Sequence, residues 1–276
     1  SLIIAEGLEG VRIGDIAYVG DLRLIGEVVR ISGREVALQC YEDTSGIRPG
    51  EHVVSTGTPL VAELGPGLIG GIFDGLERSE LELWRKTGPF IKKGYRVIPL
   101  SRERRWNFKP RVKPGDRVVE GDIIGVVKES KVIEHRVLVP VGLSGVVESI
   151  EEGDFRVDEP VAELKLPNGV KREIKLMQTW PVRIPRPYKE RLPLAQPLFT
   201  GQRVIDTFFP IAKGGTAAIP GGFGTGKTVT LHSIAKWSDA DIVIYVGCGE
   251  RGNEMADILT HFPELEDPRT GEKLIE

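Results

Sequence analysis

The stretch from Gly221 to Thr228 has the composition of a phosphate-binding loop. It reads Gly-Gly-Phe-Gly-Thr-Gly-Lys-Thr and matches the pattern G-x-x-x-x-G-K-[ST] at every fixed position. Glycines in such a loop let backbone N–H groups approach phosphate oxygens closely, and the following helix adds partial positive charge. We expect Lys227 to contact the β and γ phosphates of ATP or ADP, and the Thr228 hydroxyl to hold Mg²⁺. The predicted nucleotide-binding residues are Gly221, Gly222, Phe223, Gly224, Thr225, Gly226, Lys227, Thr228 and Val229.

The elements around this loop support the same interpretation. An apolar run at Thr216–Ile219 predicts a strand, a helix fits Val229–Trp237, and Asp241–Val246 predicts a second buried strand, as a βαβ unit requires. A flexible glycine-rich loop without a ligand is the alternative, but the added Lys and Thr argue against it. The ring of Phe223 is ambiguous, because an aromatic side chain inside the loop could simply pack against neighbouring strands.

A second group of candidate residues follows the Asp241–Val246 segment, at the end of a strand where ligands of parallel sheets bind. Glu250 is placed to orient an attacking water, and Arg251 to neutralise phosphoryl charge or fix the carboxylate. If a helix begins at Gly252, Glu254 lies near the same centre and could hold a Mg²⁺-bound water. An ordinary helix-start acid explains Glu254 equally well. We predict Cys248 to be a small buried residue rather than a nucleophile.

Composition limits the classes of protein to which the chain could belong. Its 276 residues allow two or three domains, and 40% hydrophobic with 28% charged residues is typical of a soluble globular protein. A net charge of -3 and a pI near 6.0 disfavour nucleic-acid binding. With only Cys40 and Cys248, neither a disulfide framework nor a multi-cysteine metal site is indicated, which fits a reducing cytoplasm. The apolar runs fall short of the roughly 20 residues of a spanning helix, so we expect only indirect membrane association.

The alternation of short apolar runs with turn-forming residues changes along the chain, and it predicts a multidomain protein. Short apolar runs with a Ser32-Gly33 turn predict a small N-terminal β-barrel, and a helical pattern between Pro66 and Gly94 predicts a helix there. After this helix, short apolar runs separated by turn residues again predict strands, and the residues Leu166–Val170 predict a hairpin. The predicted domains are a β-barrel over 1–65, a connecting segment joining the nucleotide-binding domain over 66–94, an all-β bulge insert over 95–184, and an incomplete RecA-like α/β P-loop domain over 185–276.

Two phrases inside the insert, Gly115–Gly125 and Gly153–Val161, look like half-repeats of a biotinyl or lipoyl carrier sandwich. A carrier needs a modifiable Lys at an exposed turn between the halves, within a Met-Lys-Met or Asp-Lys-Ala phrase, and neither phrase is present. We therefore interpret the segment as a structural β insert. The proline-rich interval from Pro181 to Pro197 predicts a stiff linker after it.

The phrase Gly249-Glu-Arg-Gly-Asn-Glu-Met255 resembles the signature that follows the P-loop in the catalytic A subunit of archaeal A-type and vacuolar V-type rotary ATPases. Further phrases similar to that family are Tyr41–Gly50, Glu63–Gly67, Thr179–Arg183 and Phe209–Gly221. By this resemblance the catalytic residues are Glu250, Arg251 and Lys227, and the metal is held by Thr228 and, through water, by Glu254. Gly222 and Thr225 depart from the residues usual in the family, which puts the rigidity of the loop and its nucleotide affinity in question.

The resemblance also implies partners and a place in the cell. It implies B subunits in a hetero-hexameric ring and central stalk subunits, a cytoplasmic position peripheral to the membrane, and ATP hydrolysis or synthesis coupled to proton or sodium transport. The chain stops at Glu276, before the Walker B Asp and the helical C-terminal domain of the family, so we expect that this piece alone does not hydrolyse ATP. The alternatives are a hexameric RecA- or Rho-like nucleic-acid translocase, and a fragment that acts only as an assembly module.

Overall fold

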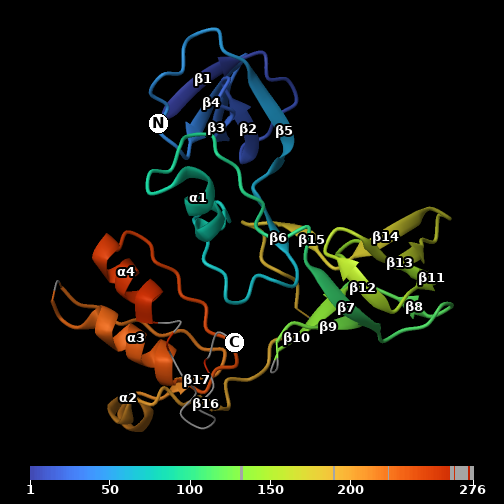
Figure 1. Ribbon diagram of the computed structural model, residues 1–276, viewed down its shortest axis with the longest axis vertical. Coiled ribbons are helices and arrows are strands. Elements are labelled where there is room, and N and C mark those ends of the chain that lie inside the picture. Colours follow the sequence, from blue (N-terminus) through green and yellow to red (C-terminus); the bar gives the residue numbers. More distant parts are fainter. Residues whose placement is uncertain (131–132, 189, 223, 262–263, 265–272, 274–276) are drawn as a thin grey trace. The chain divides into compact units, whose positions relative to one another are not determined.

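The computed structural model describes residues 1–130, 133–188, 190–222, 224–261, 264 and 273, and it divides into two compact units, Ser1–Pro185 and Arg186–Glu276 (Figure 1). Within the described residues, none of the helices has the length and apolar character that crossing a bilayer requires.

The first unit begins with a five-stranded antiparallel sheet, which has the strand order β1-β4-β3-β2-β5. Its strands are β1 (Leu2–Glu6), β2 (Asp15–Val19), β3 (Leu24–Ser32), β4 (Glu35–Cys40) and β5 (Val53–Pro59). Val19, Val28 and Leu38 are fully buried between the strands. The predicted hairpin is confirmed, because Ser32 pairs with Glu35 and Gly33 takes the left-handed φ of 60° that the tight turn needs.

A short ribbon and one helix follow this sheet. Strand β6 (Val61–Leu64) pairs antiparallel with β15 (Gln178–Pro181), which returns from far along the chain. Helix α1 (Glu80–Thr87) confirms the helix predicted between Pro66 and Gly94. It begins after Ser79, whose side chain accepts a hydrogen bond from the backbone N–H of Glu82, and it buries Leu83.

The all-β insert is built from two four-stranded antiparallel sheets, ordered β10-β9-β7-β12 and β14-β13-β11-β8 (Figure 1). They share one core that contains Phe108, Ile124, Val127, Leu164 and Ile174, all at most 1% exposed. The Leu166–Val170 hairpin is confirmed between β13 and β14. The strands are β7 (Arg105–Pro110), β8 (Arg117–Val118), β9 (Ile123–Lys128), β10 (Glu134–Leu138), β11 (Gly145–Ile150), β12 (Gly153–Arg156), β13 (Pro160–Lys165) and β14 (Lys171–Lys175).

A buried carboxylate ties the N-terminal sheet to the residues that follow β15. Glu27, on β3, is 6% exposed. It accepts hydrogen bonds from the hydroxyl of Tyr41 and from the guanidinium of Arg183, 156 positions further along the chain. The charge of Glu27 is therefore compensated inside the first unit, as a buried charge must be.

The second unit has little sheet. It contains β16 (Pro197–Leu198) paired with β17 (Ile211–Ala212), and the helices α2 (Arg203–Phe208), α3 (Lys227–Trp237) and α4 (Gly252–His261). Asp239 anchors the end of α3. Its backbone N–H donates to the carbonyl of Phe199, and its carboxylate accepts from the Phe199 N–H and pairs with Lys213 at 2.9 Å.

Two strands that the sequence predicts in this unit do not form. The segments 216–219 and 241–246 form no strands, so the expected βαβ unit is absent from the described residues. Ile244 is 84% exposed and Val246 is 76% exposed. The physical reason is that a strand of a parallel sheet needs paired neighbours and cover on both faces, and the described residues supply neither here.

Candidate functional site

The glycine-rich loop leads directly into a helix. Helix α3 begins at Lys227, within the predicted motif and two residues before the predicted start. Gly226, the residue before the helix, has a φ of 81°, and Gly224 has a φ of 76°. Both conformations favour glycine, because a Cβ atom would strain them. Phe223 lies outside the described residues.

Side chains of the motif fold back over the loop. The Lys227 ammonium donates to the carbonyl oxygen of Gly221 at 2.6 Å, and the Thr225 hydroxyl donates to the carbonyl of Gly222 at 2.8 Å. A Cβ atom on Gly221 would come within 2.5 Å of the Thr225 hydroxyl oxygen, so the loop is closely packed there. The ammonium therefore already lies at the loop backbone, within reach of an anion that the loop N–H groups would bind.

Thr228 and Val229 occupy the first turn of α3, with Thr228 half-buried and Val229 exposed. The Thr228 hydroxyl and the Glu254 carboxylate are oxygen donors of the kind that Mg²⁺ prefers. Mg²⁺ bound with a nucleotide needs few protein ligands, since phosphates and waters supply the rest. The donor types thus fit the metal. The described residues contain no group of three or more His, Cys, Asp or Glu side chains that could hold a metal ion by themselves.

The predicted carboxylate lies beside a tyrosine. Both oxygens of Glu250 are within hydrogen-bonding range of the Tyr245 hydroxyl, at 3.5 and 3.4 Å, and the same hydroxyl lies 3.3 Å from Nε2 of His232. The rings of His232 and Tyr245 meet edge to face, with 5.5 Å between centroids. Because His232 is on α3, these contacts join the helix of the phosphate loop to the segment that carries Glu250.

The environment of Tyr245 keeps its hydroxyl protonated. Partial burial, followed by the nearby charge of Glu250, raises the pKa of the phenol above its ordinary value. A protonated phenol can donate a hydrogen bond to a carboxylate. Neither Tyr245 nor His232 was predicted from the sequence; the available signal was that Tyr245 interrupts the apolar run Ile242–Val246 with a hydroxyl.

A helix does begin at Gly252, the condition under which Glu254 was expected near the same centre, and it is α4. The carbonyl of Arg251 accepts hydrogen bonds from the backbone N–H groups of Glu254 and Met255, both at 3.1 Å, so Arg251 and Glu254 flank the start of this helix. Gly247 packs so closely on the Met255 side chain that a Cβ atom would collide with it. The predicted burial of Cys248 is wrong: this cysteine is exposed, because the segment before it is not covered by a sheet.

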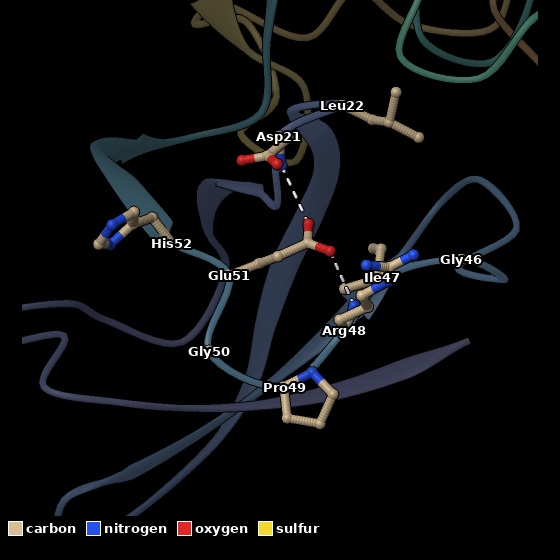
Figure 2. A pocket seen from close by; sticks show the side chains of 9 residues that line it. All are labelled: Asp21, Leu22, Gly46, Ile47, Arg48, Pro49, Gly50, Glu51 and His52. Carbon is tan, nitrogen blue, oxygen red and sulfur yellow. Dashed lines mark hydrogen bonds between the residues drawn. The ribbon is translucent and has the colours of Figure 1, made fainter.

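A surface hollow of about 560 Å³ lies in the first unit, lined in part by the end of the Tyr41–Gly50 phrase (Figure 2). Figure 2 shows the Glu51 carboxylate reaching across it, where it accepts hydrogen bonds from the backbone N–H groups of Asp21 and Arg48 at 3.1 and 2.8 Å. Both hydrogen bonds lower the pKa of Glu51, and the bond from the Arg48 N–H has the larger effect. The remaining lining residues are Leu22, Gly46, Ile47, Pro49, Gly50 and His52. The carboxylate is held by the backbone, which indicates a structural role.

Three family models match separate parts of the chain. The β-barrel domain of the ATP synthase alpha/beta family matches residues 1–57, the barrel-sandwich domain of the ATP synthase alpha/beta subunit matches residues 97–183, and the nucleotide-binding domain of the same family matches residues 201–273.

Curated relatives match almost the whole chain. The V-type ATP synthase alpha chain of Thermoanaerobacter sp. (strain X514) is 56% identical over 274 residues, which are 99% of this chain and 46% of the relative. The A subunit of the A-type ATP synthase of Thermofilum pendens is 57% identical over 276 residues, 100% of this chain and 46% of the relative. That of Thermococcus sibiricus is 53% identical over 276 residues, 100% of this chain and 47% of the relative. The chain spans about half the length of the curated relatives it matches.

Proposed function

The chain belongs to the ATP synthase alpha/beta family, and from this premise we propose that it is part of the catalytic A subunit, or alpha chain, of an A-type or V-type ATP synthase. The observation that carries the proposal is the glycine-rich loop that opens helix α3 with Lys227 folded over its backbone. The names of the relatives favour this function over a nucleic-acid translocase.

In the proposed site, ATP or ADP binds with its phosphates against the loop from Gly221 to Gly226. Backbone N–H groups and the N-terminus of α3 attract the phosphate oxygens, and Lys227 moves from the Gly221 carbonyl to the β and γ phosphates. Thr228 and Glu254 would hold Mg²⁺, Glu254 through water. When bound, the metal would neutralise phosphate charge.

The protein's own part in hydrolysis is positioning. We assign Glu250 the role of accepting a hydrogen bond from the attacking water and holding it in line with the γ phosphate. Arg251, the next residue, would offset charge that develops on the transferring phosphoryl group. In synthesis the same groups act in reverse, since the two directions share one transition state.

The proposal extends to assembly. We propose that the complete subunit assembles with B subunits into a hetero-hexameric ring, with the nucleotide site at an A/B interface. The ring would contact central stalk subunits and would lie on the cytoplasmic side, peripheral to the membrane. Ion transport, of protons or sodium, would follow through the membrane sector of that complex.

The catalytic role of the Glu250 carboxylate is tested in the complete subunit in complex with its B partner. Glu250→Gln removes the negative charge but keeps the size, so we expect nucleotide affinity to persist while ATP turnover falls about a hundredfold or more. Asp241→Asn, an exposed carboxylate nearby in sequence, is the control and is expected to leave turnover unchanged. Near-normal turnover of Glu250→Gln removes Glu250 from the catalytic role.

The phosphate contact is tested in the same complex by calorimetry with ATP. Lys227→Ala removes a mobile cation, and we expect affinity to fall by at least about tenfold, as for loss of a charge-assisted hydrogen bond. Lys236→Ala, in the last turn of the same helix, is the matched control. Unchanged affinity of Lys227→Ala contradicts the phosphate assignment, and absence of any ATP turnover in the unaltered complex leaves only an assembly role.

A further inference from the structure

Tyr245 stands between two side chains that come from different parts of the second unit. Its hydroxyl lies 3.4 and 3.5 Å from the oxygens of Glu250 and 3.3 Å from Nε2 of His232. All three side chains are partly buried, in a unit where most side chains are exposed. The Tyr245 ring packs edge to face on the ring of His232, which belongs to α3, and this contact fixes the position of the phenol against that helix.

The number of hydrogens on Tyr245 and His232 determines which group donates in each of these hydrogen bonds. An ionised carboxylate only accepts hydrogen bonds, and a phenol has one hydrogen to donate. When Tyr245 donates to Glu250, its oxygen can accept from His232 only if Nε2 of the imidazole carries the proton. The resulting order is His232 to Tyr245 to Glu250. Each acceptor is thereby oriented by the residue before it.

Glu250 needs such support, because the backbone around it is adaptable. It follows Gly249, which has a φ of 70°, and it lies two residues before the glycine that opens α4. A long carboxylate side chain on such a segment has several rotamers, and fixing one of them costs entropy. A general base acts efficiently only when it is held within hydrogen-bonding reach of the water it orients.

We propose that Tyr245 and His232 are positioning residues that hold the Glu250 carboxylate toward the phosphate loop on α3. This inference rests on the proposed catalytic function of Glu250. His232 lies on the helix that the loop opens, so the relay fixes the distance between the carboxylate and the phosphates that the loop would bind. The three distances are at the long end of hydrogen bonding, and we expect them to shorten when the γ phosphate and the attacking water are in place.

The test uses the complete subunit in complex with its B partner. Tyr245→Phe removes only the hydroxyl and keeps the ring on His232. We expect kcat for ATP hydrolysis to fall about tenfold, the effect of one lost hydrogen bond to a charged group, while the Kd for ATP changes by less than about twofold. Tyr188→Phe is the matched control, since it removes the hydroxyl of an exposed tyrosine that contacts Arg191. We expect it to leave both quantities unchanged.

A second pair of variants tests the donor role of His232. Glutamine can donate through its amide nitrogen to the Tyr245 hydroxyl, whereas alanine cannot. We therefore expect His232→Gln to retain several-fold more kcat than His232→Ala, with similar Kd values and similar thermal unfolding midpoints. Rescue of this kind separates positioning from packing, because glutamine restores the hydrogen bond and not the ring.

The outcomes are distinguishable. If Glu250→Gln lowers turnover severely but Tyr245→Phe has normal kcat, the relay is wrong and the proposed function stands. A Tyr245→Phe variant that loses nucleotide affinity and stability in proportion to kcat assigns Tyr245 a structural role only, which also overturns the inference. Near-normal turnover of Glu250→Gln overturns the proposed function, and the relay with it.

Discussion

At the residue scale, Glu27 illustrates how a buried charge is accommodated in this chain. It lies inside the N-terminal sheet, and Tyr41 and Arg183 both point their polar groups at it. The carboxylate affects the phenol in turn: partial burial and then the hydrogen bond with Glu27 raise the pKa of Tyr41 to about 12. The native fold therefore binds the phenolic proton more tightly than the unfolded chain does.

This pKa shift predicts a pH dependence of stability. The folded-state pKa of Tyr41 lies above its unfolded value near 10, so its contribution is fully present below about pH 10 and is lost as pH rises through about 12. The destabilisation caused by Tyr41→Phe should be constant from pH 7 to about 10 and shrink above that. Thermal unfolding of both proteins across this range measures it, with Tyr188→Phe as control. A difference that stays constant to about pH 12 contradicts the prediction.

At the element scale, the all-β insert depends on close contact between its strands. Gly125 on β9 has no side chain, and the fully buried ring of Phe108 on β7 occupies the space where one would lie. The Phe108 ring also packs edge to face on Phe155 of β12, with 6.4 Å between centroids. The fully buried ring of Phe108 has no free space into which to move, because interiors are close-packed.

Gly125→Ala should therefore destabilise this segment. A Cβ atom would overlap the ring of Phe108 and approach the carbonyl oxygen of Lys109 to 2.8 Å, so a strand or the ring must shift. Overpacking of this kind costs about 1–3 kcal/mol. Urea unfolding followed by tryptophan fluorescence, to which the buried Trp106 contributes, measures the change. Gly75→Ala is the control, since nothing lies within 4 Å of its Cβ position; equal stability of the two variants contradicts the packing argument.

At the scale of the whole molecule, the two units differ in how much apolar surface they bury. The first holds two clusters of buried side chains, whereas α3 has no buried residue and the run 242–246 is largely exposed. Nucleotide chemistry depends on rigid positioning of the loop and its partners. A phosphate loop on a helix without such support is poorly placed to catalyse phosphoryl transfer.

We accordingly predict that the chain Ser1–Glu276 by itself does not turn over ATP, and that its amide protons are protected unevenly. Hydrogen exchange should show strong protection at Phe108, Val127 and Leu164 and weak protection across 216–246, because local opening is easiest where few apolar contacts are buried. Strong protection across 216–246 together with measurable ATP turnover would show that the second unit is stable and active alone.

The local features of this chain could be predicted from its sequence. The Ser32-Gly33 and Leu166–Val170 hairpins and helix α3 form within a few residues of their predicted positions, and helix α1 lies inside the wider interval from Pro66 to Gly94 that was predicted to hold a helix. Turn geometry, capping and helix periodicity depend on neighbours in sequence. The family resemblance also came from contiguous phrases, and it is confirmed by relatives that match almost the whole chain.

Tertiary structure decided what depends on distant partners. Whether 216–219 and 241–246 become strands, and whether Cys248 is covered, depends on neighbouring strands that hydrophobic pattern alone cannot provide. The sequence likewise did not reveal that Tyr245 meets His232, or that Arg183 reaches Glu27 across 156 positions. Conformational preferences are properties of a few adjacent residues, whereas burial and side-chain contact arise only when segments far apart in the chain meet in space.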